Sequence, residues 1–146
     1  MIRVEAAPFY PAAELAALIA AHPHAGAVVS FTGAVRAEDG GVTALELMHY
    51  PGFTERMIAG IADAARQRFA LDGLFIVHRH GLLQSGEPIV FTGAAARHRR
   101  VAFDAVDYLM DRLKTEAPFW KREHGPAGTR WIEAREEDWA DRGRWD

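Results

Sequence analysis

The order of strand-like and helix-like segments limits the fold of this chain more than any other feature. Short runs rich in β-branched and aromatic residues predict strands, and longer runs with apolar residues every three or four positions predict helices. Several predicted strands follow one another with only a short connection, which favours antiparallel pairing. This order predicts an α+β fold with a mainly antiparallel sheet and about three helices, rather than a doubly wound parallel sheet. The predicted strands are residues 2–5, 27–32, 42–50, 74–80, 88–92, 119–122 and 129–134, and the predicted helices are residues 11–21, 51–71 and 98–115.

The composition is typical of one globular domain. The chain has 146 residues, of which 49% are hydrophobic and 25% are charged, so we expect a single domain over residues 1–146. Its longest apolar runs are too short and too polar to cross a bilayer, and residues 1–10 lack the apolar core of a signal peptide. Cysteine is absent, which excludes disulfides, thiolate metal ligands and a cysteine nucleophile.

Charge is spread unevenly along the chain. The formal net charge is −3, which argues against a broad surface for binding nucleic acid. Residues 97–100 (RHRR) are nevertheless strongly basic, whereas residues 133–141 (EAREEDWAD) are strongly acidic. A local cationic site on an acidic protein suits a small anion better than a polymer.

Two segments are candidates for binding an anion. RHRR lies at the start of a predicted helix, where positive charge opposes the helix macrodipole unless an anion is bound there. The alternative is a solvated basic turn, and the pattern does not decide between the two. In residues 33–41 (GAVRAEDGG), Arg36 could bind an oxyanion, but the loop lacks a known nucleotide-binding pattern. A hairpin loop with a solvated arginine is the favoured reading of that segment.

Two histidines stand in a strand-like segment. His78 and His80 are two positions apart, so on a strand they would share a face and could approach one metal ion. No third ligand is indicated by spacing, so we interpret them as structural histidines and predict no metal site.

A proline separates two lysines near the C-terminal end. Residues 113–125 read LKTEAPFWKREHG, and Pro118 must end the helix that carries Lys114. Lys121 then lies on an extended segment, and Phe119 and Trp120 should pin the turn against the core. Both lysines could face one pocket, where partial burial near other cations lowers a lysine pKa and enables proton transfer or nucleophilic attack. Solvated side chains are the alternative.

Several segments, taken together, resemble one known family. They are GAVVSFTGAVR, LELMHYPGFTE, IVHRHG with the GE that follows it, RHRR, LKTEAPFWKRE and RWIEAR, in this order between about residues 26 and 135. The chain resembles the MoaE family, the catalytic (large) subunits of molybdopterin synthase. The resemblance implies an α/β hammerhead-type fold and a cytosolic sulfurtransferase of molybdenum cofactor biosynthesis that uses no cofactor.

The resemblance also implies the reaction and the partners. The family converts cyclic pyranopterin monophosphate (precursor Z) to molybdopterin by installing two sulfurs as a dithiolene. Each sulfur arrives on the C-terminal thiocarboxylate of a small ubiquitin-like, MoaD-like subunit. The large subunits form a homodimer within a heterotetramer, with no nucleic acid or membrane involved. The absence of cysteine fits a reaction in which the partner supplies all the sulfur.

The site residues follow from the matching motifs. Lys114 and Lys121 are the implied catalytic residues, with Lys114 as principal acid and base. Lys121 would position the partner's tail or stabilise developing negative charge. The implied substrate-binding residues are Ala34, Val35, Arg36, His98, Arg99, Lys114, Lys121, Arg122 and Glu123. Two alternatives remain: a non-catalytic docking module for a ubiquitin-like tail, and an unrelated enzyme acting on a small phosphorylated substrate.

Overall fold

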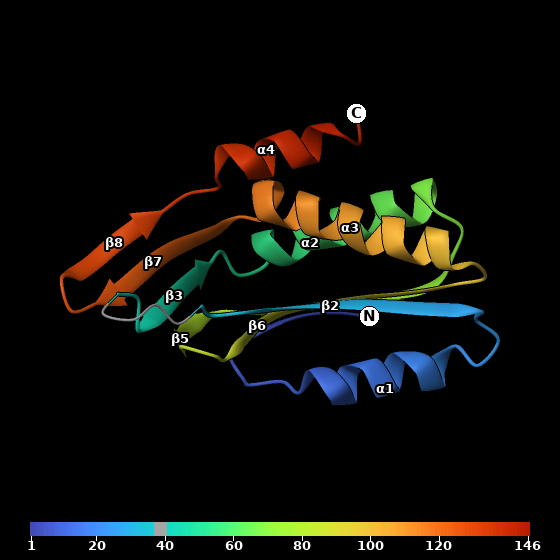
Figure 1. The fold of residues 1–146 in the computed structure, drawn as a ribbon, viewed down its shortest axis with the longest axis horizontal. Helices are drawn as coiled ribbons and strands as arrows, with labels where there is room; N and C mark the ends of the chain where they lie inside the picture. The colour runs from blue at the N-terminus through green and yellow to red at the C-terminus, as the bar shows by residue number, and fades with distance from the viewer. Residues whose placement is uncertain (37–40) are drawn as a thin grey trace.

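The computed structural model describes residues 1–36 and 41–146 and contains two four-stranded sheets (Figure 1). Most of the loop after Arg36 therefore lies outside the described residues. In the order of pairing, the first sheet is β1 (Ile2–Glu5), β4 (Leu71–Arg79), β6 (Pro88–Ala96) and β2 (Ala27–Ala34). The second sheet is β5 (Gly81–Gln84), β3 (Ala44–His49), β7 (Phe119–Gly125) and β8 (Gly128–Ile132). The helices are α1 (Pro11–Ala21), α2 (Phe53–Arg68), α3 (Arg99–Glu116) and α4 (Glu136–Gly143).

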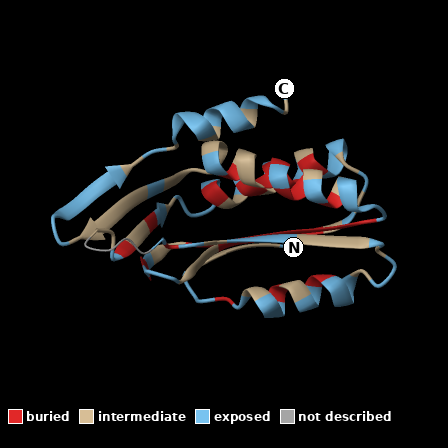
Figure 2. Cartoon of the chain, in the orientation of Figure 1, coloured by how far each residue is buried: buried red, intermediate tan, exposed pale blue. Residues whose placement is uncertain are grey.

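The first sheet is covered on both faces by helices. Helices α2 and α3 lie on one face and α1 on the other, while the second sheet extends beyond the end of these layers (Figure 1). Alternation along β4 explains this arrangement, because successive side chains point to opposite faces. Leu74 and Ile76 pack against α2 and α3, whereas Val77 packs with Phe9 and Phe91 on the α1 side. The buried residues of α2 and α3 accordingly face the sheet (Figure 2).

The predicted α+β class and the mainly antiparallel pairing are confirmed. Among the described strands, β1 and β4 pair in parallel, and every other pair is antiparallel. Within the same residues, no helix is both long and apolar enough to cross a membrane.

Two elements were not predicted. Strand β5 lies in a segment expected to be only a connection, and its four residues are too few to show a clear period. Helix α4 is a fourth helix, against about three expected, and it has no buried residue. Contacts with α3 hold it in place, which a search for an apolar stripe cannot detect. Arg144 pairs with Asp111 at 2.7 Å and Arg142 with Glu116 at 2.9 Å.

The break at Pro118 occurs as predicted. Helix α3 ends at Glu116, and Ala117 is already extended, with φ −72° and ψ 122°. A proline disfavours helical geometry in the residue before it, so the chain leaves the helix here and enters β7. The Thr54 hydroxyl donates a hydrogen bond to the Pro118 carbonyl at 3.1 Å, which ties the break to α2.

Candidate active site

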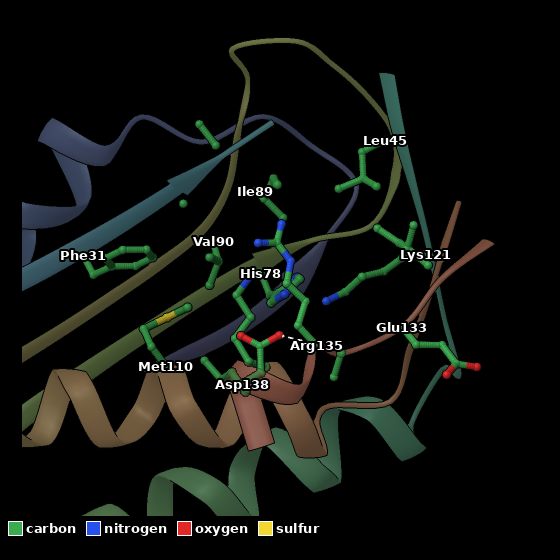
Figure 3. A pocket seen from close by; sticks show the side chains of 16 residues that line it. Phe31, Leu45, His78, Ile89, Val90, Met110, Lys121, Glu133, Arg135 and Asp138 are labelled. Atoms are coloured by element: carbon green, nitrogen blue, oxygen red, sulfur yellow. Dashed lines mark hydrogen bonds between the residues drawn. The ribbon is translucent and has the colours of Figure 1, made fainter. Parts of the chain in front are cut away.

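A cavity of about 180 Å³ lies beside the last turns of α3, where the ends of the two sheets meet (Figure 3). We call it the central cavity. Apolar side chains line much of it, including Phe31, Val90 and Met110. Its polar and charged lining residues are His78, Lys114, Lys121, Glu133, Arg135 and Asp138. A mainly apolar cavity with a few convergent polar groups is typical of a small-molecule site.

The two lysines reach the central cavity from different elements. Lys114 leaves the last turn of α3 and is exposed, whereas Lys121 lies on β7 and is half-buried. Figure 3 shows the Lys121 side chain extending toward His78 and Arg135. These are the only two lysines in the chain. The break at Pro118 therefore brings together two cations that an uninterrupted helix would have carried on one face.

The cavity changes the acidity of Lys121. Burial lowers the pKa of its ammonium group, and the positive charge of Lys114 lowers it further. The carboxylate of Asp138 opposes both effects. Asp138 is itself held in place, because its side chain accepts a hydrogen bond of 2.8 Å from the Arg135 backbone N–H at the start of α4.

Two further hollows adjoin the central cavity. The Arg36 hollow, about 160 Å³, is lined by Ala34, Val35, Arg36, Val42, Leu45, Ile89, Lys114, Glu123, Ile132 and Arg135. The tryptophan hollow, about 340 Å³, is lined by Lys114, Thr115, Ala117, Phe119, Trp120, Lys121, Trp131, Ile132, Glu133, Ala134 and Trp139. Among the described residues, only Lys114 and Ile132 line all three spaces, so Lys114 is the one polar side chain of this set that they share.

Comparison with known proteins identifies the family. The family model described as MoaE protein matches residues 4–116, which is most of the chain. The chain belongs to the MoaE family. A molybdopterin synthase catalytic subunit from Caulobacter vibrioides is 54% identical over 139 residues, covering 95% of this chain and 93% of that protein. Lys121 lies beyond the segment matched by the family model.

Solved structures agree with this assignment. A molybdopterin biosynthesis MoaE protein from Burkholderia ambifaria superposes with a TM-score of 0.85 at 46% identity, covering 99% of this chain and 97% of that one. A chain from the protein–protein complex of subunits 1 and 2 of molybdopterin-converting factor from Helicobacter pylori shares the fold. Its TM-score is 0.75 at 20% identity, over 92% of this chain and 90% of that one.

Most residues expected in a MoaE-family site lie together. Ala34, Lys114 and Lys121 line the central cavity, and Arg36 and Glu123 line the adjoining Arg36 hollow. Val35 lines the same hollow, but its backbone is already engaged. Its N–H donates to the Glu87 carbonyl at 2.9 Å, and its carbonyl accepts from the Gly86 N–H at 2.8 Å. The backbone N–H of Val35 is therefore already bonded within the protein.

His98 and Arg99 do not lie near the lysines of the same chain. His98 caps the start of α3 and Lys114 is near its end, so at about 1.5 Å per residue they are about 24 Å apart along the helix. Both residues are exposed. Their role in the anion pocket stays a prediction, and within one chain they do not line the central cavity.

Arg122 points away from the two lysines. On β7 it lies between Lys121 and Glu123, so its side chain is on the opposite face of the strand. Its guanidinium donates hydrogen bonds of 2.6 and 3.0 Å to Oε1 of Glu46, which His124 also contacts at 3.0 Å. These contacts hold the pKa of Glu46 below its usual value. Arg122 thus lines none of the three spaces, and its predicted contact with substrate stays a prediction.

Four polar or charged residues of the central cavity were missed by sequence reasoning: His78, Glu133, Arg135 and Asp138. Arg135 belongs to the segment RWIEAR, which carried the family resemblance, so that motif could have indicated it. Asp138 stands in an acidic run that reads as a solvated surface. His78 was interpreted as structural. Within the described residues, no group of three or more potential ligands suited to a metal ion is found.

We expect His78 to make the stability of the fold depend on pH. Burial, together with the positive charges of Lys121, Lys114 and His80, lowers the pKa of His78 from 6.5 to about 4. The unfolded chain therefore binds more protons between these pH values, and the folded state loses stability as the pH falls through them. The loss due to His78 should reach about 3 kcal/mol.

Urea unfolding of the parent chain and of His78→Phe, from about pH 7 to about pH 4.5, measures this loss. The free energy of unfolding should fall less steeply in the variant. Replacement of the exposed His24 by alanine is the matched control, and it should keep the parent's slope. Equal slopes in parent and His78→Phe would contradict the expectation.

Proposed function

We propose that the central cavity and its two neighbouring hollows are where this chain, a catalytic subunit of molybdopterin synthase, installs two sulfurs on precursor Z. The observation that carries the proposal is that Lys114 and Lys121, from α3 and β7, line one cavity that opens beside Arg36. The lining residues run from Phe31 to Asp138, so we also propose that residues 1–146 act as one domain. The reaction is proposed to take place in the cytosol.

The residue types suit the chemistry of the substrate and of the sulfur donor. Precursor Z carries a cyclic phosphate, and Arg36 in the adjoining hollow can bind an oxyanion through two parallel hydrogen bonds. The partner is a small MoaD-like subunit whose C-terminal thiocarboxylate is also an anion. The cations Lys114, Lys121 and Arg135 converge on the space between, so both anions can be held within reach of attack.

The two lysines have different proposed roles. Lys114 lines all three spaces and is exposed, so it can exchange its proton with water between the two sulfur transfers. We therefore assign it the principal acid–base role. Lys121 is held inside and would stabilise negative charge on the tail and on the acyl intermediate. Its lowered pKa makes it the competing candidate for proton transfer.

A small partner and a second copy of the chain complete the proposal. The complex of two molybdopterin-converting factor subunits from Helicobacter pylori, which shares this fold, supports a small second subunit. His98 and Arg99 lie about 24 Å along α3 from Lys114 in the same chain. If they bind the substrate anion, they do so in the cavity of a second copy, which is the proposed homodimer within a heterotetramer.

Reconstitution tests the proposed function. The purified chain is mixed with a thiocarboxylated small subunit and precursor Z, and dithiolene product is measured. We expect product only when all three are present. Product without the partner would favour an unrelated enzyme acting on a phosphorylated substrate. Binding of both without product would favour a docking module.

A second arm of the same experiment tests the homodimer. Lys114→Ala and Arg99→Ala chains are assayed separately and after mixing and re-equilibration. If Arg99 serves the other copy's cavity, a 1:1 mixture should regain about a quarter of the parent's active sites, because half of its dimers are mixed and each has one intact site. No gain on mixing would contradict the shared site.

A further inference from the structure

His78 is the polar residue of the central cavity that the proposed roles leave unused. It stands near the end of β4 on the face shared with Leu74 and Ile76, so it points toward the side covered by α3. Only 7% of the residue is exposed. Its ring stacks on Phe119 of β7, with ring centroids 4.0 Å apart and planes inclined by 16°. The imidazole is thus fixed in one orientation at the cavity wall.

One hydrogen bond sets the tautomer of this imidazole. Nδ1 of His78 lies 2.9 Å from the backbone carbonyl oxygen of Arg79. A carbonyl oxygen only accepts, so Nδ1 carries the hydrogen and donates it. In the neutral ring Nε2 then has a free lone pair, and burial among positive charges keeps the ring neutral, with a pKa of about 4. His78 therefore presents an acceptor and no charge.

Among the cations around His78, Lys121 is the one whose charge acts most strongly on the imidazole. Lys121 and the stacked Phe119 share a face of β7 and are about 7 Å apart along the strand. Figure 3 shows the Lys121 side chain reaching toward the imidazole. Arg79 is engaged elsewhere, donating to the Ala6 carbonyl at 3.1 and 3.3 Å. Lys114 is exposed at the end of α3.

We propose that His78 is a positioning residue, whose Nε2 accepts a hydrogen bond from the Lys121 ammonium and directs that cation into the central cavity. This positioning role rests on the proposed function. It extends the proposed function by naming the residue that holds the half-buried Lys121 in place.

A neutral acceptor suits this position better than the alternatives. A carboxylate here would pair with the ammonium and cancel the charge that the thiocarboxylate needs. An apolar side chain would leave a buried N–H without a partner, which is costly for a charged group. The other charged groups facing His78 are Lys114 from α3, His80 and Arg79 at the end of β4, and Arg135 with Asp138 from the segment before and within α4. Of the described residues that line the cavity, Asp138 and Glu133 are the acids, and Figure 3 shows the Glu133 side chain directed away from the imidazole.

The tautomer can be read directly from the unmodified chain. Long-range ¹H–¹⁵N correlation spectra of the ¹⁵N-labelled protein near neutral pH distinguish a protonated from an unprotonated ring nitrogen. We expect His78 to be protonated at Nδ1 and unprotonated at Nε2. A ring protonated at Nε2, or at both nitrogens, would overturn the proposal. This measurement needs neither partner nor substrate, so its result is independent of the proposed function.

Variants test the positioning role in the reaction. His78→Phe keeps the stacking on Phe119 but removes the acceptor, and should slow single-turnover sulfur transfer about 10- to 100-fold. Loss of the acceptor destabilises the ammonium, so the high-pH limb of the rate profile should move to lower pH. His78→Gln offers an amide oxygen as acceptor and should recover most of the rate and the parent's limb.

His80→Gln is the matched control. His80 stacks on His49 at 4.0 Å and does not line the central cavity, so rate and pH profile should stay those of the parent. The proposal fails if His78→Phe reacts as fast as the parent. It also fails if His78→Gln is as slow as His78→Phe while both keep the parent's pH limb, since that pattern indicates a merely structural role. If the parent chain gives no product under any condition, that result counts against the proposed function. The tautomer of the His78 ring then tests the proposal for His78 by itself.

Discussion

Replacement of Lys114 by alanine is expected to slow sulfur transfer in a single turnover by about 10³-fold. Within residues 1–36 and 41–146, Lys114 is the one polar side chain that lines the central cavity and both neighbouring hollows. The measurement is the rate of dithiolene formation with saturating thiocarboxylated partner and precursor Z, followed by rapid quenching. Saturation separates the chemical step from weaker binding.

Lys121→Ala is the matched comparison for this prediction. It removes the same group from the same cavity, and we expect a smaller loss in the chemical step, accompanied by weaker binding of the partner's tail. Near-normal chemistry in Lys114→Ala, with a large loss in Lys121→Ala, would assign the principal acid–base role to Lys121 instead. The lowered pKa of that lysine is what such an outcome would require.

Replacement of Leu109 by alanine is expected to lower the free energy of unfolding by about 2–5 kcal/mol. Leu109 is fully buried in α3, where it packs between α2 and the first sheet. Removing its side chain leaves a cavity under the helix that carries Lys114. Chemical denaturation monitored by circular dichroism measures the change.

The matched control is the same substitution at an exposed site. Leu82 on β5 is 55% exposed, and Leu82→Ala should cost less than about 1 kcal/mol. Equal losses in the two variants would mean that the cluster under α3 does not dominate stability.

Local physical rules account for the parts of this protein that could be predicted from sequence. Helix-forming composition, with a proline at the first position, predicted α1, and the period of apolar residues predicted α2 and α3. The steric rule for the residue before proline predicted the end of α3 near Ala117. The same rules could also have separated Arg122 from Lys121, because neighbours on a strand point to opposite faces. The rise per residue of a helix likewise separates His98 from Lys114.

The remaining site residues depend on long-range packing. His78 and Lys121 meet because the end of β4 in one sheet lies against β7 of the other, and no local pattern encodes that contact. Asp138 joins the cavity only because α4 is fixed to α3 by ion pairs such as Arg144–Asp111. Trp120 was expected to pin the turn against the core, but it is 55% exposed and packs against Tyr50 and Trp131 at the surface.

The placement of the lysines makes the chain selective toward reagents that modify amines. Apart from Lys114 and Lys121, all residues counted as Lys or Arg are arginines. The N-terminal ammonium donates to the Leu74 carbonyl at 2.9 Å. Primary amines therefore occur only at that terminus and in the central cavity. A reagent that acylates amines would leave the arginine side chains unmodified, so acylation of the half-buried Lys121, compared with that of the exposed Lys114, would report access to the central cavity and its protection by a bound tail or pterin.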